Sequence, residues 1–223
     1  MGYNIAIDGP AGAGKSTIAK LVAKELGFIY VDTGAMYRGL AVHFLKKGIV
    51  PGEVEKIEAA CEDAKVELGY ENGVQQVYLN GENITTQLRE EAVGNMASVS
   101  SAVPAVRAKL LDLQRNLAKE KDVVMDGRDI GTNVLPNADV KIFLTASAES
   151  RAKRRYDELC EKGIECDFEK IKADMEYRDK NDSQRAVAPL KKADDATLID
   201  TTEYDFDGAV KLVKGLILEK TEG

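Results

Sequence analysis

The sequence predicts an α/β fold in which a five-stranded parallel sheet is wrapped by helices. Short apolar runs alternate with stretches of helical periodicity along most of the 223 residues, a rhythm typical of parallel strands joined by helical crossovers. The first apolar run leads directly into a glycine-rich loop at residues 9–16. The length suits one sizeable domain, and a hydrophobic content of 44% suits a packed core.

Five apolar runs are the expected strands of the parallel sheet. In chain order they cover residues 4–9, 27–34, 122–129, 139–146 and 196–202. Apolar residues recur at helical spacing just after the glycine-rich loop, at Ile18, Leu21, Val22 and Leu26. The first helix is therefore expected to begin between Gly14 and Ser16.

Two segments depart from this rhythm. Residues 66–84 carry two Asn-Gly pairs between β-prone runs, and because Asn-Gly favours two-residue hairpin turns, they predict a small antiparallel meander inserted in the α/β frame. Residues 147–185 are helical in pattern and intensely charged.

Composition excludes several classes of function. A net charge of −7 and a pI near 5.0 argue against a protein that grips nucleic acid or an anionic membrane with its general surface. Cys61, Cys160 and Cys166 form no CxxC pair, and with the single His43 they cannot complete an ordinary zinc site. No apolar run approaches the length of a membrane span, and no targeting segment stands out. We expect a cytoplasmic monomer.

The loop GPAGAGKS has the pattern and the setting of the phosphate-binding loop of P-loop NTPases, between a strand and a helix. Its glycines let backbone N–H groups turn toward an anion, and the helix N-terminus adds partial positive charge. Lys15 would reach the β- and γ-phosphates, Ser16 would bind Mg²⁺, and Thr17 could bind an inner phosphate. The residues predicted to bind ATP in this region are Gly9, Pro10, Ala11, Gly12, Ala13, Gly14, Lys15, Ser16 and Thr17.

The loop alone leaves the reaction open. A GTPase would normally add an Asn-Lys-x-Asp guanine reader, and residues 179–182 have the wrong order. A motor or assembly ATPase would need coupling domains for which the chain has little room. A small-molecule kinase fits the size best.

Further motifs give the chain a specific resemblance. GPAGAGKS is followed by VDTGAMYR (31–38), DGRDIGT (126–132), VKIFLTAS (140–147) and RDKNDSQRAVAPL (178–190). Together they resemble bacterial-type cytidylate kinases over essentially the whole chain. The resemblance implies one domain, 1–223, with a core of about 1–62, 102–150 and 186–223, a monophosphate-binding insertion of about 63–101 and a mobile lid of about 151–185. It also implies transfer of the γ-phosphoryl group of ATP to CMP and dCMP.

A nucleoside monophosphate carries two charges on one phosphate, so its pocket needs several guanidinium groups. Arg38, Arg128 and Arg185 are the candidates, each from a different motif. From position alone, Arg38 could equally be a solvated helix residue. Thr33 stands where the family often has Ser, and the hydroxyl is kept.

Base and sugar contacts follow from the resemblance. Asp129 would accept from the exocyclic amine of cytosine, which uracil lacks, although on its own it could be a cap or turn residue. Ser98 and Arg107 match the family's other base contacts. Arg178 and Asp182 match its sugar contacts.

The lid would supply further arginines. Arg151, Arg154 and Arg155 lie at i, i+3 and i+4, on one side of a helix that could close over the triphosphate. The alternative is a solvated helix with acidic partners. Lys15, Arg128, Arg151 and Arg155 are the expected catalytic residues, and Arg154 would bind ATP.

The sequence is less specific about which acidic residue would hold Mg²⁺. Asp126 ends a strand and could hold Mg²⁺ through water, but Asp8 and Asp32 also end strands near the same edge. Two rival functions remain open at this point: a kinase for another small acceptor such as UMP, and a regulatory nucleotide-binding switch that transfers phosphate to no acceptor.

Overall fold

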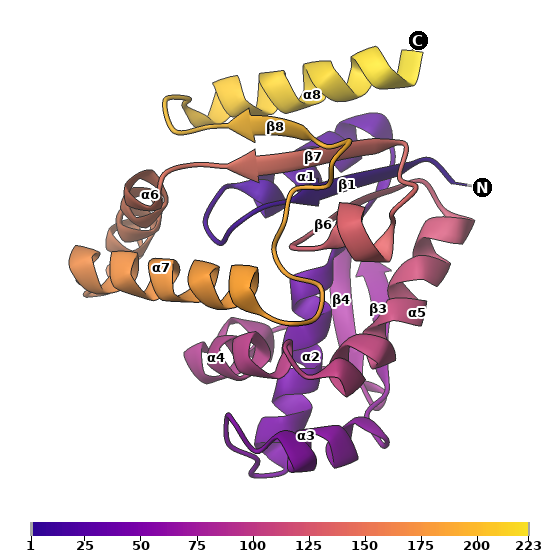
Figure 1. Ribbon diagram of the computed structural model, residues 1–223, viewed down its shortest axis with the longest axis vertical. Helices are drawn as coiled ribbons and strands as arrows, with labels where there is room; N and C mark the ends of the chain where they lie inside the picture. The colour runs from indigo at the N-terminus through magenta and orange to yellow at the C-terminus, as the bar shows by residue number, and fades with distance from the viewer. Residues whose placement is uncertain (1, 223) are drawn as a thin grey trace.

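The computed structural model describes residues 2–222 and contains the expected parallel sheet (Figure 1). Its strands run in the order β2-β6-β1-β7-β8, and every neighbouring pair is parallel. Their bounds are β1 Asn4–Asp8, β2 Ile29–Asp32, β6 Val123–Gly127, β7 Val140–Thr145 and β8 Thr197–Asp200. Each lies within one of the five predicted apolar runs, so this part of the prediction is confirmed.

Helices cover both faces of the sheet. On one face α1 (Lys15–Leu26) and α8 (Phe206–Glu222) bury Ile18 and Val213 against Ile5 and Ile7 of β1. On the other face α2 (Thr33–Lys46) and α5 (Pro104–Glu120) pack over a second cluster, which includes Ala6. Successive residues of β1 thus enter opposite cores, as a sheet buried on both sides requires.

The predicted meander is also confirmed. It is a separate antiparallel sheet of β3 (Val66–Glu71), β4 (Val74–Leu79) and β5 (Glu82–Asn83). Both residues of each Asn-Gly pair have positive φ: 52° and 76° at Asn72 and Gly73, and 50° and 85° at Asn80 and Gly81. These are the left-handed conformations that a two-residue hairpin turn needs.

The meander is continuous with the core beneath the main sheet. Val66, Val77 and Leu79 belong to the same buried cluster as Val31 of β2 and Met125 of β6. In Figure 1, β3 and β4 lie alongside α2. The insertion therefore has no core of its own.

Further helical elements complete the described part of the chain. They are α3 (Val54–Cys61), η1 (Gln87–Arg89), α4 (Glu91–Ser100), the short π-helical turn η2 (Ile130–Val134), α6 (Ala148–Glu161) and α7 (Phe168–Gln184). The charged segment predicted as a lid is a hairpin of α6 and α7. Its two helices have side-chain N-caps, because Ser147 and Asp167 accept hydrogen bonds from the N–H groups of Ser150 and Lys170. Within the described residues, no helix combines the length and the apolar character needed to cross a bilayer.

Candidate active site

The glycine-rich loop joins β1 to α1, and α1 begins at Lys15, as expected. Gly9, Gly12 and Gly14 have φ values of 148°, 75° and 86°. At Gly9 a Cβ would come within 1.9 Å of the carbonyl oxygen of Leu144 in β7, so the chain can turn this tightly against the sheet only with glycine.

Lys15 is buried at the centre of the loop. Its Nζ donates to the carbonyl oxygen of Pro10 at 2.7 Å, which curls the side chain back over the loop. Burial, with the nearby positive charge of Arg128, lowers the pKa of Lys15 below its ordinary value. An anion in the loop would oppose that shift, so Lys15 is placed to respond to phosphate. Thr17 is exposed on the first turn of α1.

Ser16 and Asp126 come together, as two ligands of one metal ion would. Ser16 Oγ donates to Asp126 Oδ2 at 2.8 Å, and the Tyr30 hydroxyl donates to Oδ1 at 2.7 Å. Burial and the nearby Asp32 carboxylate raise the pKa of Asp126, which means that its ionised form is disfavoured. A bound cation would stabilise that ionised form. A hydroxyl beside a carboxylate is a donor set that suits Mg²⁺, which commonly keeps several waters.

The other two strand-end carboxylates have different partners. Asp8 accepts from the backbone N–H groups of Ile130 and Gly131 at 2.8 and 2.7 Å, and burial raises its pKa to about 6. Asp32 caps α2 by accepting from the N–H of Ala35, and it pairs with Arg38 at 3.1 Å. Asp8 therefore fixes the η2 turn, which follows Arg128 and Asp129, whereas Asp126 faces the loop.

A network of ion pairs joins residues from three distant segments. Asp129 accepts from Arg107 of α5 and from Arg185, which follows α7, the latter at 3.2 Å. Asp182 of α7 pairs with Arg128 at 3.0 Å and lies 3.7 Å from Arg185. The Asp129 and Arg107 side chains are 6% and 7% exposed. Burial and the charge of Arg107 lower the pKa of Arg185, so this is a crowded cationic site.

Residues in the first half of α2 lie beside the ion-pair network and Asp126. Thr33 Oγ1 donates to the carbonyl oxygen of Asp126 at 2.7 Å. The guanidinium of Arg107 lies over the ring of Tyr37, 5.6 Å from its centroid. Arg38 follows directly and projects toward Asp32. The α2 residues therefore lie next to the network, but within residues 2–222 Arg38 pairs with Asp32 and not with Asp129 or Asp182.

Arg178 and Asp182 have separate partners, although both were predicted to hold the sugar. Arg178 donates to Asn95 Oδ1 of α4 at 3.1 Å, whereas Asp182 faces Arg128 and Arg185. Ser98 lies three residues after Asn95 on α4 and is half-buried. This contact ties the lid helix α7 to the element that carries Ser98 (Figure 1).

The three arginines of α6 point to different neighbours. Arg151 is buried and donates to Ala11 O in the loop at 2.8 Å and to Asp179 of α7 at 2.5 Å. Arg154 donates to the carbonyl oxygen of Thr201, after β8, at 2.6 Å. Arg155 is 45% exposed and pairs with Glu158 at 2.7 Å. Of these three arginines, Arg151 bonds the loop in the described structure, and the role of Arg155 stays a prediction.

Sequence reasoning missed residues that support the site. Gln75 of β4 bonds both backbone groups of Asp32: its Oε1 accepts from the N–H at 2.9 Å, and its Nε2 donates to the carbonyl at 3.2 Å. Tyr70 of β3 donates to the carbonyl of Tyr30 at 3.1 Å. These bonds fasten the meander to edge strand β2. No local pattern marks Gln75, because its partner is 43 residues away.

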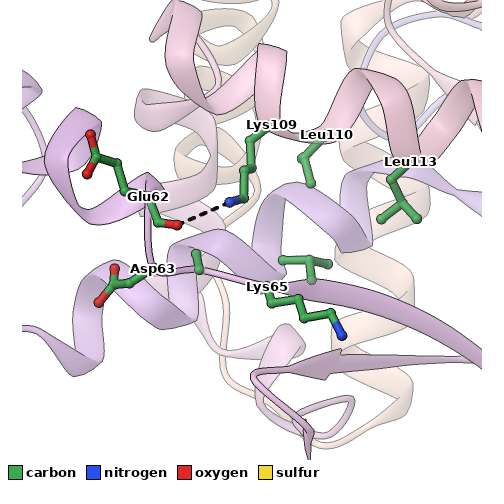
Figure 2. A pocket seen from close by; sticks show the side chains of 8 residues that line it. Glu62, Asp63, Lys65, Lys109, Leu110 and Leu113 are labelled. Carbon is green, nitrogen blue, oxygen red and sulfur yellow. Dashed lines mark hydrogen bonds between the residues drawn. The ribbon is translucent and has the colours of Figure 1, made fainter.

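A separate pocket lies away from these residues (Figure 2). Its volume is about 190 Å³, and it is lined by residues 62–66, which connect α3 to β3, and by one side of α5. Lys109 Nζ donates to the carbonyl of Glu62 at 3.4 Å. That volume is below the usual range for small-molecule sites, and its lining contains no residue of the arginine network.

Comparison with known proteins decides the family. The family model described as "Cytidylate kinase" matches residues 5–218. The chain belongs to the cytidylate kinase family. A cytidylate kinase of Caldicellulosiruptor saccharolyticus is 50% identical over 94% of this chain and 93% of its own length. One of Anoxybacillus flavithermus is 48% identical over 99% and 98%.

The fold recurs in a more distant solved structure. An uncharacterized protein from Eubacterium ventriosum superposes with a TM-score of 0.52 at 13% identity, and the match covers 99% of both chains. At that identity the likeness concerns the fold alone. The family assignment depends on the sequence matches.

Proposed function

We propose that the chain transfers the γ-phosphoryl group of ATP to CMP and dCMP, yielding ADP with CDP or dCDP. The single observation that carries this proposal is the ion-pair network beside the glycine-rich loop, formed by Arg107, Asp129, Arg185, Asp182 and Arg128. It supplies both an arginine-rich anion site and a buried carboxylate for the base. Membership of the cytidylate kinase family supports the choice of acceptor.

The loop holds the donor. Backbone N–H groups of residues 11–16 and the N-terminus of α1 face the phosphates, and Lys15 neutralises the β- and γ-phosphates after leaving the carbonyl oxygen of Pro10. Ser16 and Asp126 would hold Mg²⁺, Asp126 through water. When bound, Mg²⁺ supplies charge neutralisation between the β- and γ-phosphates.

The network holds the acceptor. Arg38, Arg128 and Arg185 bind the monophosphate, and Thr33 lies at the same edge. Each of these side chains has a carboxylate or carbonyl partner in the structure. A bound phosphate would therefore replace some of these partners. The three guanidinium groups favour the doubly charged phosphate through bidentate hydrogen bonds.

The base is recognised at Asp129. A carboxylate oxygen has two acceptor sites, so Asp129 can keep its arginine partners while accepting from the exocyclic amine of cytosine. Uracil presents a carbonyl there, which cannot donate. Ser98 and Arg107 donate to the ring acceptors, and Arg178 and Asp182 contact the sugar.

The lid completes the catalytic arrangement. Arg151 links Ala11 of the loop to Asp179 of α7, so it brings lid and loop together and excludes water. Arg128, Arg151 and Arg155 stabilise the charge of the transferring group, and Arg154 assists in binding ATP. Phosphoryl transfer depends on in-line positioning and charge stabilisation more than on a strong base.

An acceptor panel tests the proposed function. With ATP as donor, transfer is measured to CMP, dCMP, UMP, AMP, GMP and shikimate. We expect CMP and dCMP to be the best acceptors, and ATP hydrolysis without acceptor to be far slower. A preference for another compound would favour the rival kinase, and ATP binding without transfer to any acceptor would favour a nucleotide-binding switch.

Gln75 gives a test of how the meander supports the acceptor site. Because its amide fixes the Asp32 backbone, and Asp32 holds Arg38, the Gln75→Ala variant should raise the KM for CMP by roughly three- to tenfold. The KM for ATP should change little. The neighbouring Gln76→Ala variant is the control, since Gln76 contacts Val74 and Asn83 within the meander. Equal rises in both KM values would contradict this role.

A further inference from the structure

Two free cysteines lie together at the tip of the α6–α7 hairpin. Cys160 is in the last turn of α6, Cys166 directly precedes the N-cap of α7, and their Sγ atoms are 4.0 Å apart. Cys160 is exposed and Cys166 is partly exposed, whereas Cys61 is buried in α3. The pair lies outside the phosphate and acceptor sites described above.

The backbone and a ring contact hold this arrangement. Gly163, with φ at 68°, reverses the chain after α6. The N–H groups of Gly163 and Ile164 bond the carbonyls of Cys160 and Leu159 at 2.9 and 3.0 Å, so the turn is a regular helix C-terminus. Beside it, the rings of Tyr156 and Phe168 meet edge to face, with centroids 6.1 Å apart. The two thiols are therefore neighbours because of the turn itself.

We propose that Cys160 and Cys166 are a redox modification site that closes reversibly into an intramolecular disulfide. The oxidant is a low-molecular-weight disulfide. Closing the distance from 4.0 Å to the ~2.05 Å of an S–S bond requires side-chain rotation at the tip of a short turn.

The chemistry is a pair of thiol–disulfide exchanges. The more exposed Cys160 thiolate attacks one sulfur of the small disulfide, forming a mixed disulfide and releasing one thiolate. Cys166 then attacks the Cys160 sulfur and releases the second thiolate. Two protein thiols are oxidised, one small disulfide is reduced to two thiols, and the two protons pass to the released thiolates.

The bond would fasten the hairpin tip without reaching Arg151, the α6 residue that contacts the glycine-rich loop. Arg151 lies nine residues before Cys160 on α6, which is about 14 Å along a helix. The cross-link spans the exposed turn at Lys162 and Gly163, where local opening exposes the backbone to proteases. Oxidation should thus protect the tip from opening.

Peptide mapping tests the proposal on the full chain. The protein is equilibrated with oxidised glutathione, remaining thiols are alkylated, and trypsin cuts after Arg155, Lys162 and Lys170. Each cysteine then lies on its own peptide, 156–162 or 163–170. We expect these two peptides to be joined, at a mass lower than their sum by two hydrogen atoms, and to separate after dithiothreitol.

A second readout is the rate of native cleavage after Lys162. Oxidation should slow this cleavage by about fivefold or more, with no change in the Cys160→Ser variant, which also gives no joined peptide. Glutathione adducts on both cysteines, a cross-link between two chains, or free thiols after equilibration would each overturn the proposal. An intramolecular bond that leaves the cleavage rate unchanged would overturn the protective role.

Discussion

The Lys15→Met variant should lose turnover with ATP and CMP by about a thousandfold or more. Methionine fills much of the buried volume that the lysine stem occupies, but it has no charge to place against the β- and γ-phosphates. Steady-state rates in a coupled assay, with thermal unfolding as the check on folding, measure the effect.

The matched control is Lys24→Met, on an exposed position of the same helix. It should keep near-normal turnover. Turnover within a few-fold of the unmodified chain in the Lys15→Met variant would mean that the loop is not the phosphate site.

The Asp129→Asn variant should lower the preference for CMP over UMP, as a ratio of kcat/KM values, by about tenfold or more. The amide keeps the shape of the carboxylate, but its NH₂ group can donate to the uracil carbonyl, and its single oxygen accepts from cytosine less strongly. The variant should also unfold at a lower temperature, because Arg107 and Arg185 lose the charge between them.

Asp112→Asn, at an exposed position of α5, controls for the loss of one charge on the protein. The KM for ATP should be similar in both variants. An unchanged CMP-to-UMP ratio in a folded Asp129→Asn protein would place base recognition on other residues.

The fold was predictable from local signals. The three central strands β6, β1 and β7 are apolar runs buried on both faces, and each Asn-Gly pair has the positive φ values that its hairpin turn needs. These features depend on neighbouring residues in the chain. They therefore gave the five parallel strands, the start of α1 at Lys15 and the meander.

The partners within the site were less predictable, because they are set by tertiary contacts. Asp8, Asp32 and Asp126 all end strands, and nothing local distinguishes them. In the structure they bond backbone N–H groups at η2, Arg38 and Ser16 respectively. The pairing of Arg107 with Asp129 spans 22 residues, and that of Gln75 with Asp32 spans 43.

The three arginines of α6 show what helical spacing in a sequence can and cannot predict. Positions i, i+3 and i+4 spread over an arc of about 100°, which is wide enough for three side chains to meet three surroundings. Arg151 accordingly reaches the loop, Arg154 reaches the segment after β8, and Arg155 faces solvent. Periodicity predicted the common side but not the individual contacts.

Because Val66, Val77 and Leu79 belong to one buried cluster with Val31 and Met125, we expect the meander and the main sheet to unfold as one cooperative unit. Excising the meander would expose the side of α2 around Gly39, against which Val66 and Val77 pack. In evolution the residues of this insertion can change one at a time. Replacing the whole insertion by another would also require changes in the residues that pack against it.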